Sequence, residues 1–262
     1  MLTILLHSSK TTRRTDERMG PGQSPLLLSK ANDLASYVGQ LSIEQIQASM
    51  RLSHGMAVKT HEMWQDWPQS GRLPAIDLFL GDIYSGLQVH RLSEDDRKYA
   101  NEHLYILSGL YGVLRALDYI APYRLEMGYK LPAPPFNNLY KFWGDDIAKV
   151  LPSEGAIVSL SAVEYTKVVL PYLGGRLIIS PKFMTVDGKT KQPKFVTVHA
   201  KIARGAFAHW LIVNKIDDIQ KLVDFDDLGY QYSSELSTDI EPVFVCESFK
   251  GLGLSVRLLG SK

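Results

Sequence analysis

Strand-like and helical segments alternate through the second half of this chain, and this alternation limits the folds open to it. The pair Asp187-Gly188 predicts a β-hairpin that reaches Val198, and a shorter helix is expected from Asp217. Strands mixed with helices and hairpins indicate an α+β fold in which helices surround a mixed sheet. The other expected elements are strands over 156–160, 176–180 and 242–249, and helices over 161–171 and 199–215.

The first half is expected to add a strand and several helices. The apolar segment 2–6 has the character of a buried strand, and the polar segment 8–24 that follows it is typical of a surface loop. Ser42 with Gln45 forms a capping box, and Ser53 is expected to open the next helix. That helix is expected to carry the core residues Met56, Met63 and Trp64. A strand is expected over 75–80. Asn137-Asn138 is expected to cap a helix that extends to Val150 and buries Phe142, Ile147 and Val150.

The composition indicates one globular domain without an overall attraction for nucleic acid. A chain of 262 residues with 45% hydrophobic content can bury a large core, so we expect a single domain over residues 1–262. Its 29 basic and 28 acidic residues give a formal charge of +1. Any affinity for a polyanion must therefore come from local clustering.

Charge is unevenly distributed along the sequence. Six basic residues and one acidic residue lie between Lys182 and Arg204, whereas two basic and eight acidic residues lie between Lys215 and Glu241. Lysines on an exposed hairpin turn are common, so part of the basic cluster has an ordinary explanation. Lys201 and Arg204 are three residues apart on one side of a predicted helix, which makes them better candidates for a binding site.

A glycine-containing turn is the strongest local signal for an anion site. Gly109 and Gly112 follow a helix-like segment that starts near Asp95, and Arg115 and Arg124 lie just beyond them. Glycines allow a sharp turn that exposes backbone N–H groups, and such groups at a helix start bind phosphate together with arginine side chains. The pattern predicts a helix-hairpin-helix nucleic-acid element. A glycine turn between two core helices has the same pattern, so these residues alone leave both interpretations open.

Several longer segments carry a resemblance to a known family. They are Ser9-Lys10-Thr11, Gly81 to Leu87, Ser93 to Asp96, Leu107 to Arg115, Tyr123 to Gly128, Leu139 to Gly144, Glu164-Tyr165 and Ala200 to Gly205. Together they resemble the peroxide-stress protein YaaA family. The resemblance implies a cytoplasmic bacterial protein of the oxidative-stress response, with a mixed α/β domain, a positively charged cleft and DNA binding through a helix-hairpin-helix element.

The resemblance also suggests that residues far apart in the sequence share one cleft, for which two functions are open. In the first, a nucleic-acid backbone is bound with low sequence specificity, and Tyr111 or Tyr140 stacks on unpaired bases. The DNA is duplex, bubble or branched, and the binding residues are Lys10, Gly109, Tyr111, Gly112, Arg115, Arg124, Lys141, Lys201 and Arg204. We expect Lys10 to be the least exposed cation of the cleft, because it follows a buried strand.

In the second, the same cleft is an enzyme site for a small molecule or a nucleobase. Lys10 then anchors the substrate, Glu126 or Glu164 acts as general acid or base, and Tyr165 shares a proton. Each residue also has a structural explanation. Glu126 would pair with Arg124 or Arg115, and Tyr165 would be half-buried beside the sheet.

Other chemistries have no support in the sequence. The single Cys246 lies in an apolar run and is expected to be a buried thiol. The seven histidines form no HxxxH or HExxH pair and no CxxC is present, so no metal is expected. Phosphate-loop and dinucleotide-binding glycine motifs are missing, so we expect no cofactor. Without a secretory signal or a long apolar segment, we expect a cytoplasmic protein with no membrane partner, and nothing points to an obligate protein partner.

Overall fold

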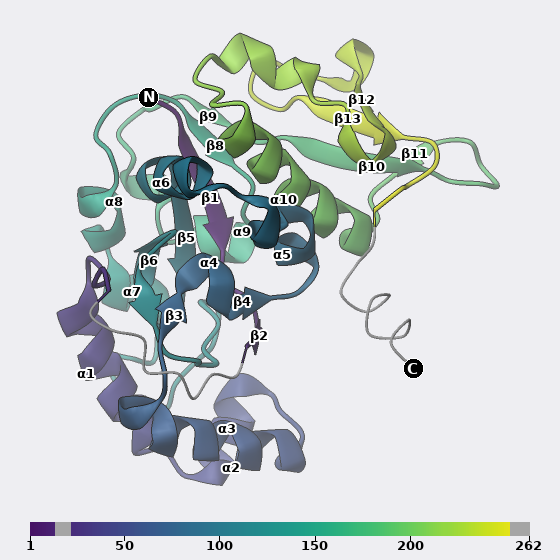
Figure 1. Ribbon diagram of the computed structural model, residues 1–262. Helices are drawn as coiled ribbons and strands as arrows, with labels where there is room; N and C mark the ends of the chain where they lie inside the picture. The colour runs from purple at the N-terminus through teal and green to yellow at the C-terminus, as the bar shows by residue number, and fades with distance from the viewer. Residues whose placement is uncertain (14–21, 252–262) are drawn as a thin grey trace.

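The central element of the computed structural model, which describes residues 1–13 and 22–251, is a five-stranded sheet in the order β6-β5-β1-β8-β9 (Figure 1). Strands β5, β1, β8 and β9 run parallel, and β6 adds an antiparallel edge. The parallel strands are buried, as their continuous apolar sequences require. The bounds are β1 Thr3–His7, β5 Leu104–Ser108, β6 Gly112–Arg115, β8 Ile157–Ser159 and β9 Ile178–Ile179.

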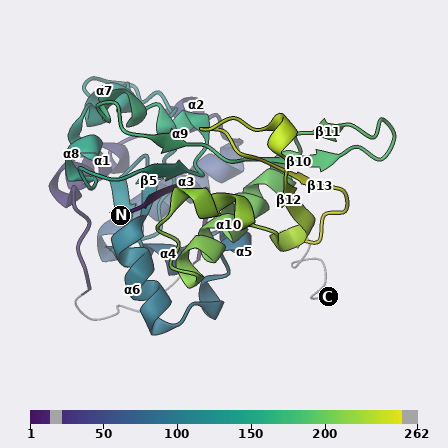
Figure 2. The same ribbon diagram turned by 90° about the horizontal axis from the view of Figure 1, so that it is seen from above.

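A second sheet of four strands follows in the order β11-β10-β13-β12. Its strands are β10 Lys182–Val186, β11 Pro193–Lys194, β12 Tyr230–Tyr232 and β13 Val243–Cys246. The β10–β11 hairpin projects from the body of the protein, as Figure 2 shows. The sheet packs on helix α10, Thr197–Val213, through an aromatic cluster that contains Phe183, Phe207 and Phe244. The expected hairpin and the helix over 199–215 are therefore confirmed.

Two glycines bring α10 against helix α5, Asp82–Leu87, at backbone contact distance. A Cβ atom added at Gly205 would lie 1.8 Å from the carbonyl oxygen of Ile83, and one at Gly86 would lie 2.0 Å from that of Ile202. No side chain fits at either position. This contact fixes the N-terminal half of α10, which carries Lys201 and Arg204.

The remaining helices cover the sheets, and α1, α2 and α3 gather on one side of the molecule (Figure 1). Short strand pairs β2–β4 and β3–β7 join the loops. The bounds are α1 Leu28–Gly39, α2 Ile43–Met50, α3 His54–Asp66, α4 Ala75–Leu78, α6 Glu94–His103, α7 Leu139–Trp143, α8 Asp146–Val150, α9 Val163–Thr166, β2 Thr11–Thr12, β3 Leu73–Pro74, β4 Phe79–Leu80 and β7 Tyr119–Ile120. The 3-10 helices are Trp67–Gln69, Val89–Arg91, Leu170–Tyr172, Ile219–Asp224, Asp227–Gly229 and Ser234–Leu236.

Local capping signals predicted several helix starts correctly. The Ser42 hydroxyl accepts a hydrogen bond from the Gln45 N–H, and the reciprocal bond completes the capping box of α2. Helix α3 begins directly after Ser53, and Trp64 is buried as expected. Met56 is 41% exposed, so its expected place in the core is wrong.

Other boundaries differ from the sequence-based expectations. The segment 75–80 forms a helical turn, α4, before the short β4, rather than one strand. Asn138 caps α7, but Gly144 has a φ of +52° and ends the helix, so a second helix, α8, begins at Asp146. The expected helix 161–171 is divided into α9 and a 3-10 turn.

The predicted helix-hairpin-helix element is wrong, because Gly109 and Gly112 lie in a β-hairpin. Gly109 lies in the turn after β5 and Gly112 begins β6, and the two strands pair in antiparallel register with Ser108 opposite Gly112. Gly112 has a φ of +68°, a left-handed conformation that glycine adopts without strain. A buried strand such as β5 is a continuous apolar run, and hydrophobic periodicity does not distinguish it from a buried helix. This ambiguity explains the error.

Candidate functional site

Polar side chains gather where the parallel strands of the central sheet end. Strands β1, β5 and β8 are neighbours with the same direction, so His7, Ser108 and Ser159 mark one edge of the sheet. In parallel α/β sheets, ligands bind at this carboxyl edge. The segment 123–128 crosses the same edge, because the Tyr123 hydroxyl and the Ser108 Oγ lie 2.6 Å apart. The candidate site therefore lies at this edge of the sheet.

Four side chains at this edge form a connected polar network. The ammonium of Lys10 lies 3.4 Å from the Glu126 Oε2. The Tyr165 hydroxyl donates a hydrogen bond to the Glu126 Oε1 at 2.8 Å, and the Ser8 hydroxyl donates to the Tyr165 oxygen at 3.3 Å. The loop after β1, the segment after β7 and helix α9 thus meet at one point.

The burial of this network controls its protonation. Burial raises the pKa of Glu126 above its ordinary value, against the opposing effects of the Tyr165 hydrogen bond and the Lys10 charge. Burial also raises the pKa of Tyr165 well above its usual value, and the negative charge of Glu126 adds to the increase. Tyr165 therefore remains a hydrogen-bond donor, and Glu126 binds a proton more readily than an exposed glutamate.

His7 lies under the network in one defined tautomer. Its ring stacks on Tyr165 with centroids 4.8 Å apart, and its Nδ1 accepts the backbone N–H of Ala162 at 3.1 Å. Burial, followed by the positive charges of Arg204 and Lys201, lowers the pKa of His7 to about 3. The imidazole is therefore neutral near pH 7, and its proton lies on Nε2.

Four cations surround this edge. Helix α10, which carries Lys201 and Arg204, packs against α5, and the Tyr84 hydroxyl of α5 donates to the His7 carbonyl oxygen at 3.0 Å. The charges of Arg204 and Lys201 lower the pKa of His7. Lys10 pairs with Glu126, and Arg124 lies two residues before Glu126 in the same segment; both charges lower the pKa of Tyr129, which burial and Glu126 raise. No described carboxylate forms an ion pair with Lys201, Arg204 or Arg124. The edge therefore presents positive charge that the described chain leaves uncompensated.

The expectation that Lys10 is the least exposed of these cations is wrong. The Lys10 side chain is 55% exposed, because the chain leaves the sheet after Ser8. Arg204 is half-buried, and this burial lowers the pKa of its guanidinium. The backbone contact between α10 and α5 holds Arg204 near the body of the protein.

Glu164 and Tyr140 contribute to the framework around the network. The Glu164 Oε1 accepts the backbone N–H of Gly128 at 2.8 Å, and the Tyr140 hydroxyl donates to the Glu164 carbonyl oxygen at 2.9 Å. These contacts tie α9 to α7 and to the segment that carries Glu126. Lys141 is exposed on α7, and no contact within the described chain joins it to the network.

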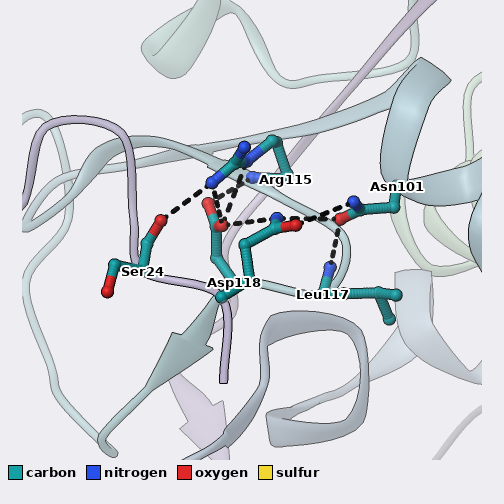
Figure 3. A network of polar contacts seen from close by, with 6 residues as sticks. Ser24, Asn101, Arg115, Leu117 and Asp118 are labelled. Atoms are coloured by element: carbon teal, nitrogen blue, oxygen red, sulfur yellow. Dashed lines mark hydrogen bonds and ion pairs between the residues drawn. The ribbon is translucent and has the colours of Figure 1, made fainter. Parts of the chain in front are cut away.

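Tyr111 is an interior residue, which corrects its predicted role in base stacking, and Arg115 is held in an ion pair with Asp118. Tyr111 is completely buried, so it cannot stack on a base. The Arg115 guanidinium donates to the Asp118 Oδ1 and to the Ser24 carbonyl oxygen, while Asn101 accepts the Leu117 N–H nearby (Figure 3). Asp118 has no exposed surface and requires this partner.

The edge also contains residues that were not predicted as site residues. His7 and Ser8 follow directly from β1, and a polar pair after a buried strand is the signal that points to them. Tyr123 was missed as a site residue because only the fold brings it to Ser108. Cys246 is buried, as expected. In residues 1–13 and 22–251 no group of three or more metal-ligating side chains is present.

Comparison with known proteins identifies the family. The sequence model of a family described as peroxide stress protein YaaA matches residues 1–236. The chain belongs to the YaaA family. This confirms the resemblance found in the sequence, and the family is a peroxide-stress family. The match includes all the residues of the strand-end network in this YaaA-family protein.

Relatives of similar length support the assignment. A UPF0246 protein of Salinispora tropica is 50% identical over 258 residues, which covers 98% of both chains. A UPF0246 protein of Roseobacter denitrificans is 38% identical over 240 residues, covering 87% of this chain and 92% of the relative. One from Legionella pneumophila is 36% identical over 249 residues, covering 91% and 96%. In this YaaA-family chain, no helix of the described part is long and apolar enough to cross a membrane.

Proposed function

We propose that this YaaA-family protein binds DNA during peroxide stress through the phosphate backbone, with low sequence specificity. The proposed contacts are Lys10, Arg124, Lys201 and Arg204. Phosphate contacts position a protein on DNA but do not read the base sequence. Duplex, bubble and branched DNA all present suitable phosphates.

The observation that supports the proposal is the position of α10, which carries Lys201 and Arg204: it packs against α5, and Tyr84 of α5 donates a hydrogen bond to the His7 carbonyl oxygen at 3.0 Å. A half-buried guanidinium without a described carboxylate partner is a favourable site for phosphate. The formal net charge of +1 makes this local cluster, rather than the whole surface, the source of attraction.

The proposal differs from the family expectation in the element that binds. Gly109, Gly112, Tyr111 and Arg115 are assigned to the β5–β6 hairpin and its supporting network, so they are left out. The proposed contacts to the DNA phosphates come instead from side chains at the strand ends and on α10. Lys141 remains a peripheral candidate, because it is exposed on α7.

Fluorescence anisotropy with labelled duplex, bubble and three-way-junction DNA tests this function. If about four phosphates are neutralised, the logarithm of the binding constant falls with the logarithm of salt concentration at a slope of about −3.6. Two duplexes of unrelated sequence should bind within about threefold of each other, because the contacts address phosphates. No binding of any DNA form at low salt contradicts the proposal.

A second function, acid–base chemistry at the same edge, is favoured by the hydrogen bond from Tyr165 to Glu126. Glu126 would transfer a proton, Tyr165 would hold the carboxyl group in place, and Lys10 would bind an anionic or carbonyl oxygen of the substrate. The substrate is a small molecule or a nucleobase. The loss of a measured reaction in Glu126→Gln, with DNA binding retained, is the result that supports this function.

A further inference from the structure

A cavity of about 440 Å³ opens beside Lys10, between helix α3 and the chain around Pro122. Its size lies within the range of roughly 300–1,000 Å³ that is usual for small-molecule sites. Lys10 also contacts Glu126, so the cavity adjoins the strand-end network. The lining combines positive, apolar and acidic groups, and their chemistry indicates what fits.

The positive part of the lining comes from three side chains. Lys10, Lys59 and Arg124 line the cavity, and none of them except Lys10 forms an ion pair with a described carboxylate. The Arg124 Nε–H is buried without a hydrogen-bond acceptor in the described chain. These groups suit a phosphate or another oxyanion.

The apolar part is formed by Met56, Met63 and Pro122. Met56 is 41% exposed although helix α3 buries its other face through Ala57 and Trp64. Flexible thioether side chains adapt to flat rings and make favourable contacts with aromatic groups. This part of the cavity therefore suits a planar ring.

The acidic part consists of Glu62 and Asp66, one turn apart on α3. Neither carboxylate pairs with a cation in the described part of the chain, so both are available as hydrogen-bond acceptors. Carboxylates accept hydrogen bonds from the amino groups of bases. Acidic side chains beside three cations suit a ligand that carries both an anionic group and an amino group.

We propose that this cavity binds one nucleotide unit, with its phosphate on Lys10, Lys59 and Arg124, its base against Met56 and Met63, and a base amino group on Glu62 or Asp66. The inference rests on the proposed function, because it makes the cavity the place where one nucleotide leaves the DNA stack. Base extrusion into a pocket is the way in which proteins reach a base for chemistry. A free mononucleotide carries the same phosphate and base, so it is the alternative source of the bound nucleotide.

Isothermal titration calorimetry with dAMP, dTMP, 2-deoxyribose 5-phosphate and inorganic phosphate tests the proposal on the full chain. We expect dAMP to bind about tenfold more tightly than dTMP, which lacks an exocyclic amino group, and more tightly than the two base-free compounds. Equal binding of all four compounds shows an anion site only and overturns the proposal. Competition between dAMP and bubble DNA then separates the sources: displacement assigns the cavity to DNA, and its absence assigns it to the free nucleotide.

Two variants localise the binding. Met63→Trp should fill the cavity and reduce dAMP affinity at least tenfold, with circular dichroism as the folding check. Glu62→Gln with Asp66→Asn is the second variant, because both residues are exposed. It should reduce the preference for dAMP over dTMP, because a neutral amide oxygen accepts a hydrogen bond more weakly than a carboxylate. Glu102→Gln, exposed on α6, is the matched control.

The experiment separates this inference from the proposed function. If Met63→Trp retains full dAMP affinity, the cavity assignment is wrong while DNA binding stands. If wild-type protein binds duplex DNA but no nucleotide, the cavity assignment is again wrong while the DNA-binding proposal stands. If neither DNA nor a nucleotide binds, both proposals fail.

Discussion

The Tyr165 hydroxyl donates a hydrogen bond to the Glu126 carboxylate at 2.8 Å, and Lys10 lies 3.4 Å from the other oxygen of the same carboxylate. A glutamate with one donor on each oxygen is held in a single orientation. Tyr165 in turn stacks on His7, and the charges of Arg204 and Lys201 lower the pKa of His7. The geometry thus connects the acid–base pair to the cations proposed to bind phosphate.

The first prediction concerns His7 and stability at low pH. Because the pKa of His7 is lowered to about 3 in the folded protein, the unfolded chain binds more protons between pH 6.5 and about 3. Stability should therefore fall as pH decreases through this window, by up to about 1.4 kcal/mol per pH unit. Urea denaturation at pH 7 and pH 5 measures the difference.

His7→Gln removes the titrating group, so its stability should depend less on pH over this window. His90→Gln, on the 3-10 helix Val89–Arg91, is the control and should behave as wild type. An unchanged pH dependence in His7→Gln would show that other groups cause the effect.

The second prediction concerns Glu126. Its pKa is raised in the folded state above 4.5, so the native protein binds more protons than the unfolded chain in the window above that value. Its contribution to stability therefore falls as pH rises through the raised pKa. Glu126→Gln should lose this dependence and become more stable relative to wild type as pH increases. Chemical denaturation from pH 4 to pH 8 provides the measurement, and a constant difference between the two proteins contradicts the assignment.

The third prediction concerns the backbone contact of α10 with α5. Gly205→Ala places a Cβ atom 1.8 Å from the Ile83 carbonyl oxygen, so the helices must separate. Overpacking of this kind costs about 1–3 kcal/mol or more. Thermal denaturation should show a clear decrease in Tm. Gly188→Ala is the matched control, since no atom lies within 4 Å of its added Cβ, and an equal loss in both variants would contradict the packing argument.

The fourth prediction separates a structural arginine from a binding arginine. Arg115→Ala leaves the fully buried Asp118 without its main cationic partner (Figure 3). We expect a loss of about 3–5 kcal/mol in the free energy of unfolding, measured by urea denaturation. The affinity of the folded protein for DNA, measured at a temperature where it remains folded, should stay within about twofold of wild type. A large loss of affinity with full stability would return Arg115 to the binding surface.

Local chemistry explains what the sequence predicted well. The capping box of Ser42 and Gln45 and the Asp187-Gly188 turn involve near neighbours only, and both are found in the structure. The sequence of β5 was interpreted as helical because a strand buried on both faces shows no alternation of apolar and polar residues. The helix-hairpin-helix prediction followed from this interpretation. The position of β5 between β1 and β6 is a tertiary property.

The sequence predicted several residues of the candidate site but not their positions in the structure. Lys10, Glu126 and Tyr165 were named from the resemblance, and the structure brings them together. The burial of Tyr111 and the ion pair of Arg115 depend on contacts with Tyr123, Asp118 and Ser24, which no sequence pattern indicates. The exposure of Lys10 depends on how the chain leaves the sheet.

The most direct test of the account is the salt dependence of DNA binding in the double variant Lys201→Ala with Arg204→Ala. Removing two phosphate contacts should weaken binding to every sequence equally and reduce the magnitude of the salt slope by about 1.8. Lys189→Ala, on the exposed hairpin turn, should leave the affinity and the slope unchanged within error. A double variant that binds DNA with wild-type affinity and slope would contradict a phosphate site at the strand ends.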